Sequence, residues 1–429
     1  MPSDIRTNSG TKALRRVQMG PEVTPGTQVP ATAIWRGPAT LNDLRKVKLP
    51  AEDSGVAPGI SRAYIPSFDA KIALAPIEAT YEQLPYLFEM GALKVGTGVA
   101  DGAGSGKIYA YPFWTTAANK LTQAKLGIRS FEFGDDLNVQ QMPFGFADNI
   151  HLTGKQGGTW MMSGDIMGRQ AVDIGMLTGT TIAFTGTHTI TDSGSGFTAA
   201  NGFPAAPFMV KVIGTALNDG VYTVTTIVPG TLTVTETTTI EAAGNTVSVY
   251  QYFTTLSLPS VTDMPFGNAK LFVDNVGGTL GTTQITNTFL EADITIKTGI
   301  VGQPTSDGAL PFNHLEFVSE DITAKLTFLL NTKSDAERRL WKGTQGSPNT
   351  PPVPRQIRIG TAGAPLTTPG TTYSYFTFLW DMAGIWEVWD GIGDSKGSDI
   401  VVATFHARDD PTAALYAKAT VVNQVASLP

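Results

Sequence analysis

The sequence predicts a mainly β protein in which a small β domain is inserted into a larger, split β domain. Charged residues make up only 16% of the 429 residues, well below the roughly 25% of typical soluble domains. Thr, Ser, Asn and Gly must therefore cover much of the surface, and these residues suit strands and turns. Apolar and polar residues alternate along most of the chain, whereas helical periodicity is confined to two short segments. Period two with β-branched residues indicates half-buried antiparallel strands.

Two stretches near the start are expected to be irregular. Residues 1–37 are expected to form an N-terminal arm, which carries the basic cluster Lys12, Arg15 and Arg16. Three cations are few for gripping a nucleic acid, so an arm that is solvated or paired with acids is favoured. Residues 37–69 hold four prolines and mixed charges, which predicts a long excursion that is exposed or docked on a neighbour.

Two short helices are expected. Thr80 and Gln83 have the spacing of a capping box, and apolar residues follow at helical spacing over 81–91. Pro85 fits only the first turn of such a helix. Ser334 and Glu337 have the same spacing and precede a helix of two turns that should stop at Gly343.

The remaining segments of the larger domain read as strands. Those with the clearest alternation are 160–166, 289–296, 322–328, 373–378, 400–406 and 417–425. They lie on both sides of a middle section of different character, so they are expected to belong to one domain formed by 1–177 and 253–429.

The middle section, 178–252, is predicted to be an autonomous inserted β domain. It holds nineteen Thr but only four acids and one base. The turn Asn218-Asp219-Gly220 leads into one strand, and Pro229-Gly230 leads into the next, where Leu232 and Val234 share a face. Such alternation suits a small sheet with one buried face. The ends of the insert are expected to lie close together.

Motifs that resemble catalytic sites are explained better as turns. Gly393-Asp394-Ser395-Lys396-Gly397 matches the Gly-x-Ser-x-Gly pattern, but a nucleophile elbow needs a helix after the Ser. A strand over 400–405 follows here, so a hairpin turn is favoured. Glycines over 96–106 precede Lys107, but the spacing departs from that of a phosphate-binding loop, and a hairpin tip is expected.

Metal, cofactor and sugar sites find little support in the residue patterns. The four histidines are scattered, without metal-ligand spacing. Asp390, Asp394 and Asp399 do not fit a calcium loop, and charged turns explain them more simply. Trp380, Trp386 and Trp389 could stack on sugars, but core or subunit contacts are favoured. We therefore predict no catalytic, cofactor-binding or metal-binding residues and no enzymatic activity.

Charge and terminal sequence limit the compartment and partners. The net charge of −7 argues against an ordinary nucleic-acid binder. The absence of cysteine removes disulfides and thiolate zinc sites. The first residues lack the apolar stretch of a Sec signal, and no apolar run approaches the ~18 residues of a membrane helix. The chain is expected to be made in a soluble compartment without membrane contact.

Several segments of the split domain resemble the tail tube proteins of long-tailed, non-contractile bacteriophages. The resemblance is carried by Ala13-Leu14-Arg15-Arg16-Val17-Gln18, Gly20, Glu22, Thr24-Pro25-Gly26-Thr27, Thr32-Ala33, Trp35-Arg36-Gly37, Tyr81-Glu82-Gln83-Leu84-Pro85-Tyr86-Leu87-Phe88-Glu89, the hairpin over 386–406 and the final segment 421–429. The insert is similar to a small β module that recurs in phage tail proteins, through 190–197 and 218–224. The regions in which these segments lie make up about half of the chain.

This resemblance implies a β-sandwich or half-barrel subunit with one or two short helices. Six such subunits would close a ring, and rings would stack into the hollow tail tube of the virion after assembly in the host cytoplasm. The implied partners are the subunit itself, a tape-measure protein, and the tail terminator and distal tail proteins. Genome DNA would pass through the lumen without sequence-specific binding. Ring closure would also remove exposed sheet edges.

Two other structural functions compete with the tail tube. In one, the chain is a virion-surface or secreted adhesin whose insert and tryptophans bind carbohydrate. In the other, it is a decoration or joining protein of the capsid or connector. The insert is expected to lie outside a tube, because a module of its size would block a lumen.

Overall fold

The structure, a computed structural model, describes residues 12–51, 62–113, 120–135, 139–306, 310–343 and 352–429. It confirms the mainly β prediction, with large antiparallel sheets and two α-helices among the described residues. The helices are α1 (Leu84–Gly91) and α2 (Thr332–Lys342). Single 3-10 turns occur at Lys12–Leu14, Gln123–Lys125, Ala199–Asn201 and Phe266–Asn268.

The strands of the larger domain come from both sides of the insert. Before it lie β1 (Arg16–Pro21), β2 (Ala33–Trp35), β3 (Ala39–Asp43), β4 (Lys46–Lys48), β5 (Tyr64–Ser67), β6 (Ala70–Glu78), β7 (Val99–Ala100), β8 (Lys107–Pro112), β9 (Arg129–Gly134), β10 (Val139–Lys155), β11 (Trp160–Gly168) and β12 (Val172–Asp173). After it lie β20 (Ala269–Asn275), β21 (Phe289–Lys297), β22 (Ile300–Gln303), β23 (His314–Phe317), β24 (Asp321–Leu329), β25 (Arg355–Pro365), β26 (Tyr375–Trp389), β27 (Gly393–Ser395), β28 (Ser398–Ala407) and β29 (Ala417–Asn423). All six segments predicted as strands from their alternation lie in or overlap these strands.

The main sheet contains the neighbours β3-β6-β11-β10-β21-β24-β28 in this order, all antiparallel. Two long strands, β10 and β26, each pair with different strands along their two halves, so each connects the main sheet to other strands. The first part of β10 leaves the main sheet and pairs with β9 and β12, and β9 then pairs with β1. The last part of β26 pairs with β28, whereas its first part joins β25 and β29 in a second sheet. β20 extends this second sheet beside β25, and β8 extends it beside β29.

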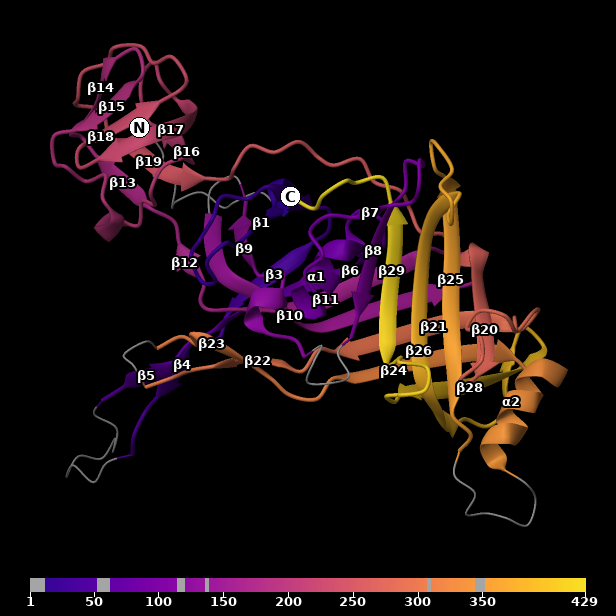
Figure 1. Cartoon of the computed structure of the whole chain (residues 1–429). Coiled ribbons are helices and arrows are strands. Elements are labelled where there is room, and N and C mark those ends of the chain that lie inside the picture. The colour runs from indigo at the N-terminus through magenta and orange to yellow at the C-terminus, as the bar shows by residue number, and fades with distance from the viewer. Residues whose placement is uncertain (1–11, 52–61, 114–119, 136–138, 307–309, 344–351) are drawn as a thin grey trace.

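The sheets enclose one large hydrophobic core, and α1 lies within their curl (Figure 1). All eight residues of α1 are buried. Its start follows the predicted pattern in part, because the Gln83 N–H donates to Thr80 Oγ1 over 3.3 Å. The Gln83 side chain donates instead to the Ile34 carbonyl at 3.0 Å, which ties the helix to β2. Trp160, Trp380 and Trp386 are among the largest fully buried side chains.

Helix α2 begins earlier than its sequence pattern predicts. The N-cap residue is Asn331, and Ser334 is the third helical residue that completes the capping box. The helix therefore has eleven residues rather than two turns, and Gly343 follows it as predicted. Glu337, taken from sequence as part of the cap, is 6% exposed and pairs with Arg355 of β25.

The insert forms a separate seven-stranded sheet in the order β13-β19-β16-β17-β18-β15-β14. Its strands are β13 (Met176–Gly179), β14 (Ile182–Gly186), β15 (Thr189–Asp192), β16 (Phe208–Ile213), β17 (Gly220–Val228), β18 (Thr231–Val234) and β19 (Val247–Tyr252). They bury a hydrophobic cluster of their own, which includes Phe184, Val210 and Leu232. The first and last strands pair with each other, Met176 opposite Tyr250. Figure 1 shows this sheet set apart from the larger domain.

The expected arm and excursion both contribute strands. Within residues 1–37, β1 pairs with β9 and with β2, and Val17, Met19 and Trp35 are buried in the main core. Within residues 37–69, β3 joins the main sheet, while β4 and β5 form an exposed two-stranded sheet. Residues 1–11 and 52–61 of these predictions lie outside the described part of the chain.

Candidate functional site: the polar face of the main sheet

One face of the main sheet is polar because of the period-two alternation in β6, β11, β10, β21, β24 and β28. Residues such as Ile150, Ile294 and Leu326 point into the core and are fully buried, so their neighbours along each strand point to the other side. We call that side the polar face. It is formed by Lys71, Asp165, His151, Thr153, Lys155, Glu291, Asp293, Thr295, Lys297, Asp321, Thr323, Lys325, Thr327, Thr404 and His406.

The strand register arranges these side chains in rows across the face. In one row Thr153 is opposite Asp293, Asp293 opposite Lys325, and Lys325 opposite Thr404. A second row contains His151, Thr295, Thr323 and His406. Directly opposite residues lie about 4.5–5.5 Å apart at their Cβ atoms, so opposite charges within a row can pair.

Three lysines on the polar face form ion pairs with carboxylates of adjacent strands. Lys71 Nζ lies 3.0 Å from Asp165, Lys155 Nζ lies 2.6 Å from Glu291, and Lys297 Nζ lies 2.7 Å from Asp321. The hydrogen bond from Lys297 lowers the pKa of the Asp321 carboxyl, and the same bond raises the pKa of Lys297. Each pair leaves the lysine partly neutralised while both partners remain partly exposed.

Two of the four histidines also lie on this face beside carboxylates. His151 Nε2 is 2.6 Å from Asp293, although the two residues are 142 positions apart in sequence. His406 lies between Asp321, at 3.2 Å, and Glu387, at 3.1 Å. The scattered histidines in the sequence gave no sign of these contacts, because each partner comes from a different strand.

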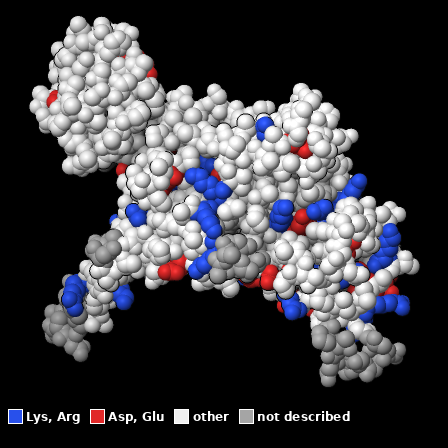
Figure 2. Space-filling model, viewed as in Figure 1, with Lys and Arg blue, Asp and Glu red and all other residues white. Residues whose placement is uncertain are grey.

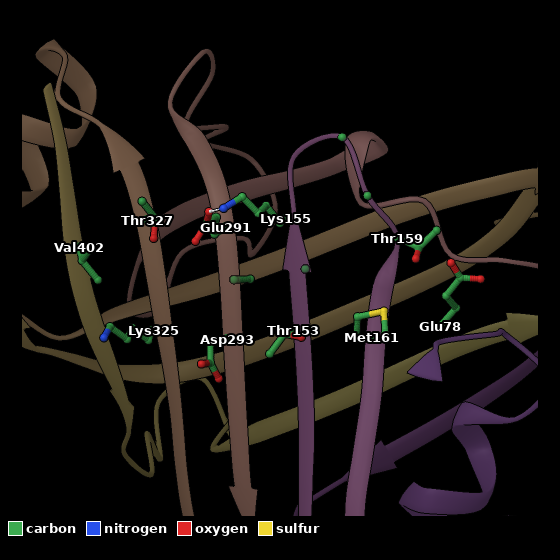
Figure 3. Close-up of a pocket in the computed structure, with 14 residues that line it drawn as sticks. Glu78, Thr153, Lys155, Thr159, Met161, Glu291, Asp293, Lys325, Thr327 and Val402 are labelled. Carbon is green, nitrogen blue, oxygen red and sulfur yellow. Dashed lines mark ion pairs between the residues drawn. The ribbon is translucent and has the colours of Figure 1, made fainter. Parts of the chain in front are cut away.

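Part of the polar face is hollowed into a depression of about 890 Å³. Figure 3 shows Thr153, Lys155, Glu291, Asp293, Lys325 and Thr327 lying along the strands that form its floor, with Lys155 and Glu291 joined as an ion pair. Glu78, Thr159 and Met161 lie at one side of it. The depression carries both signs of charge and is open, so it is a broad polar surface rather than a closed pocket.

Other residues singled out from sequence lie in turns or in the core. Ser395 is at the end of β27 in a hairpin with β28, with Ser395 opposite Ser398. Lys396 and Gly397 between them both have positive φ, 53° and 80°, which is the type I′ geometry of tight hairpins.

The glycine-rich segment 96–106 contains the hairpin of β7 and β8, where Asp101 accepts from the N–H groups of Thr372 and Tyr373.

The candidate calcium and sugar residues are not brought together as sites. Asp394 lies opposite Asp399 in the β27–β28 hairpin, and both are exposed. Within the described parts of the chain, no three His, Asp or Glu side chains are placed to hold a metal ion. Trp380, Trp386 and Trp389 are 0%, 2% and 7% exposed, which confirms that they belong to the core.

Two further observations concern the described helices and the comparison of the sequence with known proteins. No helix in the described residues is long and apolar enough to cross a membrane. Neither a protein-family model nor a curated protein sequence matches the chain.

Proposed function

We propose that this chain is a structural subunit of the tail tube of a long-tailed bacteriophage. Subunits would associate into hexameric rings, the rings would stack, and the polar face would line the channel through which DNA passes. The observation that carries the proposal is the polar face of the main sheet, together with the outer side of β3, unpaired among the described strands, at one end of that sheet. The resemblance of residues 13–27, 35–37 and 81–89 to tail tube proteins supports the same function.

One edge of the main sheet favours association with another copy. Among the described strands, β3 pairs with β6 only, so its other side offers free backbone N–H and C=O groups. At the opposite end of the order, β28 is not a free edge, because the short β27 and the last part of β26 pair with its outer side; the outer side of β3 is therefore the edge that another copy could cover. Unpaired sheet edges invite a further strand or chain. A ring of subunits is one way to cover such edges.

The charges of the polar face suit a channel for DNA. Free lysines would hold phosphate groups, but Lys71, Lys155 and Lys297 are each paired with a carboxylate, and Lys325, the remaining lysine of the polar face, lies opposite Asp293. Asp293, Glu387 and Glu78 add further negative charge on or beside the face. A neutral lining does not hold phosphate and a negative lining repels it, so DNA can slide instead of binding.

The remaining partners follow from the same proposal. A tape-measure protein would fill the channel before DNA, and terminator and distal tail proteins would cover the ends of the tube.

The insert would project outward, because Figure 1 shows it apart from the polar strands β21, β24 and β28. On the side shown in Figure 2 the insert has few charged atoms, in keeping with its four acids and one base over 178–252.

The adhesin alternative loses its best residues in the structure. Sugar stacking needs an exposed aromatic ring, and the three clustered tryptophans are buried against Phe328 and Phe405 or other core rings. We therefore retain the tail tube as the single proposal.

Negative-stain electron microscopy of the purified chain tests this function. We expect rings with a central channel, or tubes built from such rings. Compact monomers at high protein concentration, together with binding to a glycan array, would contradict the proposal and favour an adhesin.

A further inference from the structure

A basic pocket of about 450 Å³ lies where β1, β2 and the start of β3 meet. Its basic side chains are Lys12, Arg15, Arg16 and Arg36, all exposed, and no acidic residue lines it. The rest of the lining includes apolar groups, among them Val17, Phe133 and Leu256. We use the name basic pocket for this set of residues.

The cations of the basic pocket have no acidic partner among the described residues. Arg36 donates to the Pro259 carbonyl at 2.9 Å, and the Arg16 guanidinium lies 5.9 Å from the centre of the Phe253 ring. Trp35, another lining residue, is 3% exposed, and its Nε1 atom finds no hydrogen-bond partner within the described structure. This N–H is itself buried, so the four exposed cations, and not Trp35, are what the basic pocket offers to an acidic partner.

An acidic hairpin provides groups of complementary chemistry. It runs over 390–399, from the end of β26 into the start of β28, and it exposes Asp390, Asp394 and Asp399 together with one base, Lys396, so three acids and one base give it a net charge of −2. These three carboxylates make no hydrogen bond or ion pair with the described residues. The same hairpin exposes Ile392, an apolar side chain that is 57% accessible. The acidic hairpin therefore offers both negative charge and an apolar tip.

The two surfaces lie toward opposite ends of the strand order of the main sheet. The basic pocket includes Pro38 and Ala39 at the start of β3, and β3 is the first strand of the order β3-β6-β11-β10-β21-β24-β28. The acidic hairpin contains β27 and leads into β28, the last strand of that order. Figure 1 shows β3 and β28 far apart in the molecule. A contact between these surfaces thus requires two copies of the chain.

We propose that the acidic hairpin of one copy docks into the basic pocket of the next, head to tail along the direction of the sheet order. This contact rests on the proposed function, because a head-to-tail contact is heterologous and forms a ring when its rotation closes. The apolar lining of the basic pocket favours a second copy over a nucleic acid, because a phosphate backbone has no group that matches Ile392.

Charge reversal with rescue tests the contact in the full-length protein. The basic variant is Arg15→Glu with Arg16→Glu, and the acidic variant is Asp394→Lys with Asp399→Lys. Each should slow assembly, followed by light scattering and sedimentation velocity at low salt, by about tenfold or more, since steering between complementary charges is lost. The variant that combines all four changes should recover the wild-type rate, because the reversed charges again match.

A matched control for the basic variant is Lys120→Glu with Lys270→Glu, which makes the net charge more negative by the same amount, at exposed lysines outside both surfaces. This control should assemble like the wild type. Raising salt should slow wild-type assembly, because charges separated by more than ~10 Å are screened at 0.1 M.

Three outcomes would overturn the contact. If the wild type assembles and both reversal variants assemble equally well, the hairpin and pocket do not meet, although the proposed function stands. If the combined variant is not rescued, the two surfaces do not face each other. If the basic variant loses binding to short duplex DNA while assembly is unchanged, the basic pocket serves a nucleic acid. A wild type that stays monomeric under all conditions contradicts the proposed function itself.

Discussion

Glu337 is a buried charge whose neighbours fix α2 against the core. Both of its carboxylate oxygens accept from the Arg355 guanidinium, and one also accepts from Trp386 Nε1 at 3.2 Å. The side chains of Glu337 and Arg355 are 8% and 10% exposed. Removing one member of such a pair leaves the other charge buried and uncompensated.

Replacement of Arg355 therefore tests the energetic role of this pair. Arg355→Met should lower the free energy of unfolding by about 3–5 kcal/mol, measured by urea denaturation. The double variant Arg355→Met with Glu337→Leu should recover part of this loss, because no unpaired charge remains. Equal stability of the single variant and the wild type would show that the pair contributes nothing.

Asp192 makes the stability of the insert depend on pH. Burial raises the pKa of its carboxyl, but hydrogen bonds from Thr181, Gly196 and Gly194 outweigh that effect and hold the pKa below its usual 3.8. A group whose pKa is lower in the folded state stabilises the fold above its unfolded pKa. The contribution is lost as the pH falls through the folded pKa.

We expect hydrogen exchange in the insert to accelerate below about pH 4, after correction for intrinsic exchange rates. Asp192→Asn should accelerate exchange at neutral pH and flatten the acid dependence. All seven tryptophans lie outside residues 178–252, so tryptophan fluorescence serves as the control for the larger domain. An unchanged pH dependence in the variant would contradict the role of Asp192.

Sequence predicts the polar side chains of the main sheet better than it predicts their partners. Alternation over 289–296, 322–328 and 400–406 placed Asp293, Lys325 and His406 on the side away from the core. The pair of His151 and Asp293 depends on β10 lying beside β21, and the whole insert separates these strands in sequence. Periodicity within one strand carries no information about such a neighbour.

At the scale of elements, β26 shows why one strand was recognised only in part. Alternation predicts 373–378, but the strand is Tyr375–Trp389. Residues from Ala383 to Trp386 are mostly buried on both sides, because β26 passes there from the second sheet to the main sheet. A strand buried on both faces does not show apolar–polar alternation, so alternation alone does not reveal where β26 ends.

Gly384 lies at this change of partners and permits a close backbone approach. A β-carbon at this position would lie 2.0 Å from the His406 carbonyl oxygen. Gly384→Ala should therefore destabilise the fold by about 1–3 kcal/mol, measured by urea denaturation. Gly391→Ala is the control, because open space surrounds that glycine, and an equal effect of both changes would contradict this explanation.

The insert is an element that should be removable. Its first and last strands pair, and the Gln251 N–H donates to the Gly175 carbonyl at 2.8 Å, so entry and exit lie side by side. Replacement of 178–252 by a short linker should leave assembly intact, as seen by electron microscopy. Loss of all rings and tubes in a folded deletion variant would show that the insert takes part in assembly.

At the scale of the whole molecule, composition anticipated the fold class but not the surface that we propose to line a channel. The low share of charged residues predicted a surface of Thr, Ser, Asn and Gly that suits strands and turns, and the structure gathers several of the charges into pairs on the main sheet. Sequence alone does not identify the side that we propose to face a lumen, because that side depends on the order of strands that lie up to hundreds of residues apart in the chain.

The central claim is that the chain assembles with its polar face turned toward an enclosed channel. The chain has no cysteine, so single cysteines can be introduced cleanly at Lys325 on the polar face and at exposed Thr226 in the insert. Labelling with a maleimide on a large polymer should modify both positions in dissociated subunits, but only Thr226→Cys in assembled particles. Equal labelling of Lys325→Cys before and after assembly would contradict the claim.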